Sequence, residues 1–297
     1  MKNKFIKSFD DTKIYCYIWD DVKKPKGVVQ IFHGMAEHAK RYDHFAKFLN
    51  KQGYIVFADD HRGHGKTARG TKLGTYKGKD IFYDTLRDEI FFSKMLKKKY
   101  KLPLYIFGHS YGSFIAQEYI TQCSLYDKAI ICGSAFMKGR ADVKFGLMLA
   151  WQLKTFAAHK PAKLIEKINF SSYQKLVKTG SWLNSNDKEV KKYYADKFNG
   201  YALSNKFYFN MFNAFRHIYK KSAIKKIPKE KPIFLIAGEN DPVGNMSKSV
   251  KALHRFYQSI GLKDVQLKIY KNARHEILNE PKIQKTVYKD VMKFIKK

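Results

Sequence analysis

Between residues 27 and 133, short apolar runs alternate with stretches that are apolar on one side only. The runs typical of buried strands are GVVQIF, GYIVFAD, PLYIFGH and DKAIICG. The intervening stretches repeat apolar residues at helical spacing, over about 38 to 51, 80 to 98 and 111 to 122. Because buried strands that alternate with amphipathic helices are typical of βαβ units around a parallel sheet, the pattern predicts an α/β fold.

The alternation stops near residue 137 and resumes after Pro228. Between these points the chain carries long helical patterns rich in Phe, Tyr, Trp and Lys, without strand-like runs. No low-complexity linker separates this region from the rest, so we expect it to pack on the α/β part. We therefore predict one core, formed by residues 1–136 and 229–297, with residues 137–228 as a helical insertion.

The two ends of the chain extend the same pattern. FIKSFDDTKIYCYIW near the N-terminus is divided by Asp10 and Asp11, which is typical of an antiparallel hairpin at a sheet edge. Beyond Pro228 come the apolar runs KPIFLIAGEND and VQLKIY, with helices expected near 247 to 260 and from about 281. Both ends of the chain therefore belong to the predicted α/β core.

Composition places the chain among globular proteins. Of its 297 residues, 44% are hydrophobic, which is enough for a sizeable core. The N-terminus does not resemble a secretory signal, and no apolar run is long enough to span a bilayer, so we expect a cytoplasmic protein. Cys16, Cys123 and Cys132 lie far apart among apolar or aromatic neighbours, and we expect them to be buried thiols without a disulfide or a metal.

A formal net charge of +32 raises the question of a polyanionic partner. The basic residues are 50 lysines and 8 arginines spread over the whole chain, whereas recognition of phosphates and bases favours arginine. We therefore interpret the charge as a solvated surface and expect no nucleic-acid partner, while contact with an anionic membrane stays open. A nucleic-acid-associated protein, the alternative, would bind in a way that weakens with salt.

The segment LYIFGHSYGSFIAQEYI, residues 104–120, passes from a strand-like run to a helix-like one through Ser110. Gly108 and Gly112 flank the serine at positions where side chains would crowd a sharp turn. An ordinary turn with serine as the helix N-cap would explain the same residues. The other interpretation is a nucleophile elbow, in which a strained turn holds the serine hydroxyl above the sheet.

Two later loops supply the partners that a nucleophilic serine needs. A serine hydroxyl requires a base to take its proton and an acid to orient that base. Asp241 and His275 each lie just past an apolar strand, in the order Ser, Asp, His of α/β-hydrolases. Each assignment has an alternative: Glu239 is a rival for the acid, and His275, one of 10 histidines, could be an ordinary surface residue. Together, the two residues favour a catalytic triad.

The same chemistry needs N–H donors for the oxyanion of a tetrahedral intermediate. In the α/β-hydrolase fold one donor is the backbone N–H after the nucleophile, here Tyr111. The other comes from the loop after the third strand, IFHGMAEHAKRYDHF, which nominates the N–H of Met35. This mechanism requires no metal and no organic cofactor.

The other histidines near these loops are interpreted as structural. Three of them have no Cys or carboxylate cluster at ligand spacing, so we expect no metal site there. These are His33, His38 and His44. In the segment DDHRGHGKT, His61 and His64 are interpreted as parts of a turn, with Arg62 in an internal salt bridge or hydrogen bond.

Five segments together resemble the monoacylglycerol lipase and lysophospholipase-like branch of the serine α/β-hydrolases: HGMAEHAKRYDHFAKFLNKQGY, ADDHRGHGKT, GHSYGS, GENDPVGN and ARHEILNE. The resemblance covers the chain outside residues 137–228, which correspond to the helical cap of that family. It implies that Ser110, Asp241 and His275 are the triad, with the oxyanion donors named above. Tyr111 departs from the methionine usual in these lipases, although a backbone donor tolerates that change.

By this resemblance the chain is expected to hydrolyse esters of single-chain lipids, monoacylglycerols or lysophospholipids, through an acyl-enzyme. Two segments of the insertion, residues 144–158 and 206–219, carry more aromatic residues than one buried helix face needs. The residues expected to bind the acyl chain are Phe145, Met148, Trp151, Phe209 and Phe212. A small-ester carboxylesterase, an aminopeptidase and a non-catalytic binding module of the same fold are the alternatives.

Overall fold

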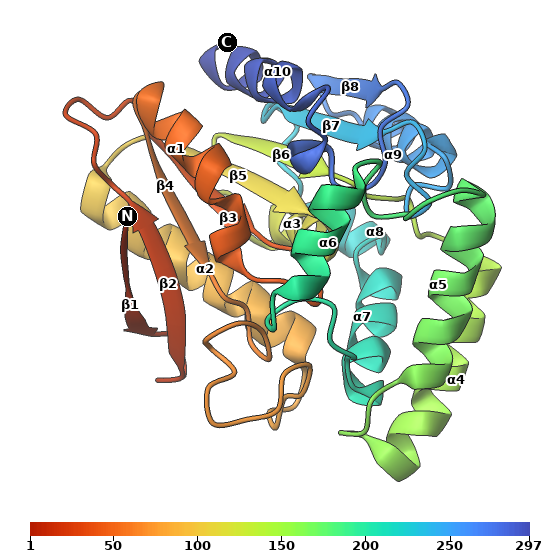
Figure 1. Ribbon diagram of the computed structural model, residues 1–297. Helices are drawn as coiled ribbons and strands as arrows, with labels where there is room; N and C mark the ends of the chain where they lie inside the picture. The colour runs from red at the N-terminus through yellow and green to blue at the C-terminus, as the bar shows by residue number, and fades with distance from the viewer.

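The computed structural model describes residues 1–297 and contains one eight-stranded sheet with the order β1-β2-β4-β3-β5-β6-β7-β8 (Figure 1). β1 (Lys2–Lys7) and β2 (Lys13–Trp19) form an antiparallel hairpin, and β2 also pairs antiparallel with β4 (Tyr54–Asp59). The remaining pairings are parallel. The other strands are β3 (Gly27–Phe32), β5 (Leu104–His109), β6 (Lys128–Cys132), β7 (Ile233–Gly238) and β8 (Val265–Tyr270). The predicted α/β fold is confirmed.

Helices cover both faces of the sheet, which explains why the central strands are apolar throughout. Successive side chains of a strand point to opposite faces, so Val28 and Val29 belong to two separate cores. The core around Val29 is closed by α1 (Asp43–Lys51) and α10 (Gln284–Lys296). The core around Val28 is closed by α2 (Ile81–Tyr100), α3 (Tyr111–Gln122) and α9 (Lys248–Ser259).

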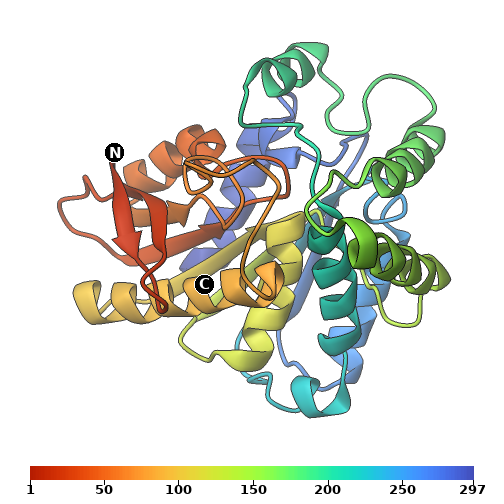
Figure 2. The same ribbon diagram turned by 90° about the horizontal axis from the view of Figure 1, so that it is seen from below.

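Five α-helices lie between β6 and β7, where the strand pattern of the sequence stops. They are α4 (Ala141–Ala157), α5 (Lys163–Val177), α6 (Asp187–Ala195), α7 (Asn205–His217) and α8 (Lys221–Ile224). Figure 1, and Figure 2 from below, show them gathered along one side of the sheet. α7 packs against α4 and α2, so its Phe207, Met211 and Phe215 are buried. The division into a core and an inserted unit, residues 137–228, stays a prediction.

Three further features of the chain are its short 3-10 helices, its cysteines and the length of its apolar helices. Short 3-10 helices, η1 (Ala39–Tyr42) and η2 (Ile277–Asn279), follow the loops after β3 and β8. Cys16, Cys123 and Cys132 are buried, as the sequence predicts. No helix combines the length and the apolar character needed to cross a bilayer. The cytoplasmic location stays a prediction.

Candidate active site

Ser110 lies at a sharp turn between β5 and α3. Its φ of 52° and ψ of −119° are strained for a residue with a side chain. The two flanking glycines explain how the turn is tolerated. A Cβ on Gly112 would lie 2.1 Å from the carbonyl oxygen of Phe32, and one on Gly108 would lie 2.5 Å from the oxygen of Gly112. The turn therefore requires glycine at both positions.

Asp241 and His275 follow β7 and β8 and lie next to each other in the interior. Nδ1 of His275 is 3.0 Å from Oδ2 of Asp241, and both side chains are almost completely buried. Because a carboxylate only accepts hydrogen bonds, the proton is on Nδ1, and Nε2 is left with its lone pair. The backbone N–H of Val243 donates to the other oxygen of Asp241 at 2.9 Å. Glu239, the rival acid, is exposed and accepts from the N–H of Asn272.

Charge and burial act in opposite directions on His275. Burial disfavours the imidazolium, but the charge and hydrogen bond of the adjacent Asp241 carboxylate, with smaller contributions from Glu276 and Glu37, together outweigh it. The net effect raises the pKa of His275 above its ordinary value of 6.5. The arrangement is that of a base whose protonated form is stabilised by its neighbour.

The loop after β3 approaches Ser110 closely. A Cβ on Gly34 would lie 3.2 Å from Cβ of Ser110. His33 holds this loop, because its Nδ1 donates to the oxygen of Gly34 at 2.7 Å and its Nε2 accepts from the N–H of His61 at 2.9 Å. The backbone N–H groups of Met35 and Tyr111 donate no hydrogen bond within the protein. Two free donors therefore flank the serine.

Sequence reasoning missed a buried ion cluster that ties the loop after β3 to the loop that carries His275. Arg41 binds both carboxylate oxygens of Glu276, at 2.5 and 2.9 Å, and also pairs with Glu37. Glu37 in turn accepts from the N–H of Gly34 at 2.5 Å. Burial would raise the pKa of Glu37, but the charge of Arg41, together with His109 and His33, holds that pKa well below its ordinary range.

Two cavities meet at Ser110 and Met35. The larger cavity, of about 370 Å³, is mostly apolar and runs between α3, α4, α5 and α7. The smaller cavity, of about 90 Å³, also contains His275 and is lined by several polar groups. Its lining includes Glu37, Glu166, Tyr193, Tyr194, Tyr201 and Tyr208. A serine at this junction can contact a ligand with one long apolar part and one short part that forms hydrogen bonds.

Comparison with known proteins agrees with this geometry. The sequence profile of the Hydrolase_4 family, described as "Serine aminopeptidase, S33", matches residues 23–282. The chain belongs to the Hydrolase_4 family. It is 26% identical to the monoglyceride lipase homolog of Monkeypox virus, over 97% of this chain and 96% of the relative. It is also 26% identical to the monoacylglycerol lipase of Mycolicibacterium smegmatis, over 94% of this chain and 91% of that protein.

Solved structures give the same α/β-hydrolase fold. A thermostable carboxyl esterase from Bacillus coagulans, in complex with glycerol, superposes with a TM-score of 0.90 and 27% identity. That match covers 99% of this chain and 97% of the esterase. A soluble variant of monoglyceride lipase from Saccharomyces cerevisiae shares the fold at a TM-score of 0.78 and 20% identity. The predicted resemblance to the lipase branch of the α/β-hydrolases is confirmed.

The residues expected to bind the acyl chain separate into two groups in this Hydrolase_4 member. Phe145 and Phe212 line the larger cavity that reaches Ser110. Met148, Trp151 and Phe209 instead line a different hollow, between α4 and α7. This hollow contains neither Ser110 nor His275, but it shares Met137, Arg140, Val143 and Phe215 with the larger cavity. The apolar residues of α4 spread over more than one helix face, so their order in the sequence could not assign them to one cavity.

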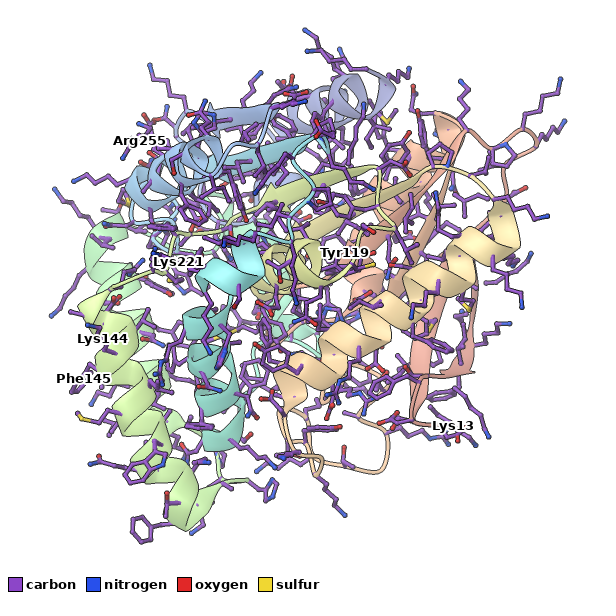
Figure 3. All side chains as sticks on the ribbon, turned by 180° about the vertical axis from the view of Figure 1, so that it is seen from behind. Lys13, Tyr119, Lys144, Phe145, Lys221 and Arg255 are labelled. Carbon is purple, nitrogen blue, oxygen red and sulfur yellow. The ribbon has the colours of Figure 1, made fainter.

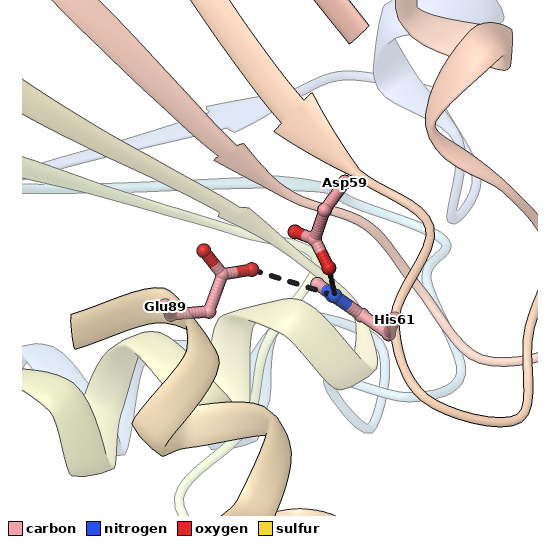
Figure 4. Close-up of side chains that lie close together, drawn as sticks. All are labelled: Asp59, His61 and Glu89. Atoms are coloured by element: carbon pink, nitrogen blue, oxygen red, sulfur yellow. Dashed lines mark hydrogen bonds and ion pairs between the residues drawn. The ribbon is translucent and has the colours of Figure 1, made fainter. Parts of the chain in front are cut away.

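A buried polar cluster lies below the loop after β4 (Figure 4). Nδ1 of His61 is 3.2 Å from Oδ2 of Asp59 and 3.4 Å from Oε1 of Glu89. Burial, and then the charge of Asp59, raise the pKa of Glu89 well above its ordinary value. No cluster of metal-ligating side chains includes His33, His38 or His44.

The same turn contains the predicted internal ion pair. Arg62 is 2% exposed and donates to both carboxylate oxygens of Asp88, at 2.6 and 2.8 Å. It also binds both oxygens of Asp10 at 2.8 Å, which joins the turn after β4 to the β1–β2 hairpin. The interpretation of Arg62 as an internal salt-bridge residue is confirmed.

Proposed function

We propose that the chain hydrolyses carboxylic esters of single-chain lipids, monoacylglycerols or lysophospholipids, with Ser110 as the nucleophile. The observation that carries the proposal is the position of this serine, in a strained turn where a larger apolar cavity meets a smaller one lined by Glu37, Glu166 and several tyrosines. The relatives named as monoglyceride lipases, which match nearly the whole chain, support the same substrate class.

The buried pair of Asp241 and His275 supports their roles as the other two members of the triad. His275 would take the proton of Ser110 as the hydroxyl attacks the ester carbonyl, and would then give it to the leaving alcohol. Water would enter next, lose a proton to His275 and release the acid from the acyl-enzyme. Asp241 would stabilise the imidazolium in both steps without accepting the proton itself.

The free N–H groups of Met35 and Tyr111 support an oxyanion hole. Negative charge develops on the carbonyl oxygen as the serine attacks, and backbone donors held in place stabilise that charge without reorganising. His33 and Glu37 would keep the loop after β3 in position, through their hydrogen bonds to Gly34. The bulky side chain of Tyr111 is buried and leaves the backbone N–H available.

The lining of the two cavities supports separate binding sites for the acyl chain and for the alcohol of the ester. Phe145 and Phe212, with other apolar residues of α4, α5 and α7, would surround the acyl chain in the larger cavity. The smaller cavity would hold a short hydroxyl-bearing alcohol, for which Glu166 and the tyrosine hydroxyls offer hydrogen-bond partners. On this proposal the inserted helices, residues 137–228, form the cap that selects the substrate.

Substrate preference tests this proposal. We expect turnover of p-nitrophenyl esters to rise from acetate to medium and long acyl chains, because the larger cavity gains apolar contacts with each added methylene. Monoolein and lysophosphatidylcholine should be hydrolysed, and trioleoylglycerol hardly at all, because the smaller cavity of about 90 Å³ has no room for two further acyl chains. A strong preference for acetate, or for an aminoacyl arylamide, would contradict the lipid assignment and leave the serine mechanism intact.

The rim of the larger cavity supports contact with a membrane surface as part of the same proposal. Phe145, Ile168 and Leu176 line this cavity and are 52%, 43% and 40% exposed. Exposed lysines lie beside them on α5, at Lys167 and Lys175. An apolar rim with basic neighbours favours the interface of an anionic bilayer, from which a lipid ester could enter directly.

Sedimentation with vesicles tests this contact. The double variant Ile168→Ser/Leu176→Ser should bind phosphatidylglycerol-containing vesicles several-fold more weakly than the parent, because it removes the exposed apolar rim. Phe5→Ser, at an exposed apolar residue of β1, serves as the matched control and should bind like the parent. Equal binding by all three proteins would show that the rim does not contact the membrane.

A further inference from the structure

The outer hollow between α4 and α7 differs chemically from both cavities at Ser110. It has a volume of about 700 Å³. Figure 3 shows α4 and α7 from behind, with Lys144 labelled on α4. Its apolar lining includes Val143, Leu147, Met148, Trp151 and Phe209. Its basic lining consists of Lys138, Arg140, Lys144, Arg216 and Lys220. No carboxylate lines it.

The positive charge of the outer hollow is mostly uncompensated. Arg140 pairs with Asp142, whereas the other basic residues of the lining form no ion pair. Two of these, Lys144 on α4 and Arg216 on α7, line the hollow together with several apolar residues. A surface that only had to stay soluble would not need large apolar side chains among these cations, yet Met148 and Trp151 are 51% and 55% exposed.

The basic side chains of the lining lie at one end of the hollow. α4 and α7 run antiparallel, as shown by the contact of Gly146 with Phe212 and the hydrogen bond from Asn205 to the oxygen of Ala157. The start of α4 therefore lies beside the end of α7, and the basic residues gather there. Phe209 lies two turns before Arg216, about 10 Å along the helix. The hollow thus has a cationic end and an aromatic end, and at the aromatic end the ammonium of Lys154 lies 3.9 Å from the centroid of the Phe209 ring.

We propose that the outer hollow binds a single-chain amphiphile with an anionic head group, such as a fatty acid carboxylate. The head group would lie among Lys144, Arg216 and Lys220, and the tail would lie over Trp151 and Phe209. A nucleic acid fits this surface poorly, because its phosphates would leave the apolar end uncovered. This ligand class is inferred from the lining residues alone, so the proposal does not require Ser110 to be catalytic.

Equilibrium dialysis with labelled laurate tests the site. The protein is first treated with a dodecyl fluorophosphonate, which is expected to fill the larger cavity from Ser110. We then expect one further laurate per chain, bound at least about tenfold more weakly by Lys144→Glu/Arg216→Glu and by Trp151→Ala. Dodecanol, which has no charge, should also bind at least about tenfold more weakly than laurate. The matched control is Lys191→Glu, at an exposed lysine of α6 without an ion pair, and it should bind laurate like the parent.

Three outcomes would overturn the proposal: no saturable binding, laurate binding that ignores the charge reversal, or equal affinity for dodecanol. If the parent protein binds anionic vesicles but not monomeric laurate, the proposal is also wrong, and the hollow is part of a surface that contacts a bilayer. Circular dichroism checks that each variant is folded. If the fluorophosphonate fails to react, the proposed reaction is in doubt, and the charge-reversal variants still separate the outer hollow from the larger cavity in untreated protein.

Discussion

Replacing Ser110 with alanine should lower kcat for a p-nitrophenyl ester by about a million-fold, the scale expected when a triad loses its nucleophile. Alanine keeps the Cβ that the turn already accommodates and removes only the hydroxyl, so the fold should persist. A fluorophosphonate probe should label the parent once per chain, and peptide mapping should place the label on Ser110. The variant should take up no label and keep the circular dichroism spectrum of the parent.

Ser113 supplies the matched control for this experiment. It lies one turn further along α3, is buried, and donates its hydroxyl to the carbonyl oxygen of Ser110 at 2.5 Å. Ser113→Ala should therefore still be labelled at Ser110 and should retain most of its turnover. Labelling of another residue in the parent, or full activity of Ser110→Ala, would refute the catalytic assignment.

Replacing Asp241 with asparagine should lower kcat by about four orders of magnitude. The amide can donate where the carboxylate accepts, so it holds the imidazole in the wrong tautomer, with the proton on the nitrogen that must accept it. Glu239→Gln is the matched control, because this residue lies two positions earlier but is exposed and bonded to Asn272. It should lower kcat only slightly. The reverse pattern would make Glu239 the acid.

The pH dependence of kcat/KM tests the role of Asp241 independently. Only neutral His275 can take a proton, so kcat/KM should fall as the pH drops through the pKa of this residue. Asp241 raises that pKa, so the acid limb of the parent should lie above pH 6.5. Asp241→Asn removes the carboxylate, and the residual activity should extend to lower pH than in the parent. An acid limb that does not move would mean that another group controls it.

The sequence located the candidate triad because strands, loops and chain order are local properties. Ser110 lies between a buried strand and a helix, and the two glycines beside it leave a recognisable pattern. Asp241 and Glu239 could not be separated in the same way, since both follow β7 within a few residues. Only the direction of the two side chains separates them, and it depends on the packing of the next loop.

Other parts of the site depend on contacts that no local pattern records. Arg41 and Glu276 are 235 positions apart, so their pairing is set by the tertiary fold alone. On α4 the sequence contains apolar residues all round the helix, because one side faces the larger cavity and the other faces the outer hollow. Phe145 and Trp151 are equally apolar, and only the position of α7 decides which cavity each one lines.

The larger and smaller cavities have only Ser110 and Met35 in common. An acyl group attached to the serine would fill the larger one, so the next reactant has to arrive through the smaller one after the first alcohol has left. That route admits a short alcohol as readily as water. Where water is scarce and glycerol abundant, the same site would make esters instead of breaking them, and the balance between the two directions would follow the composition of the solvent.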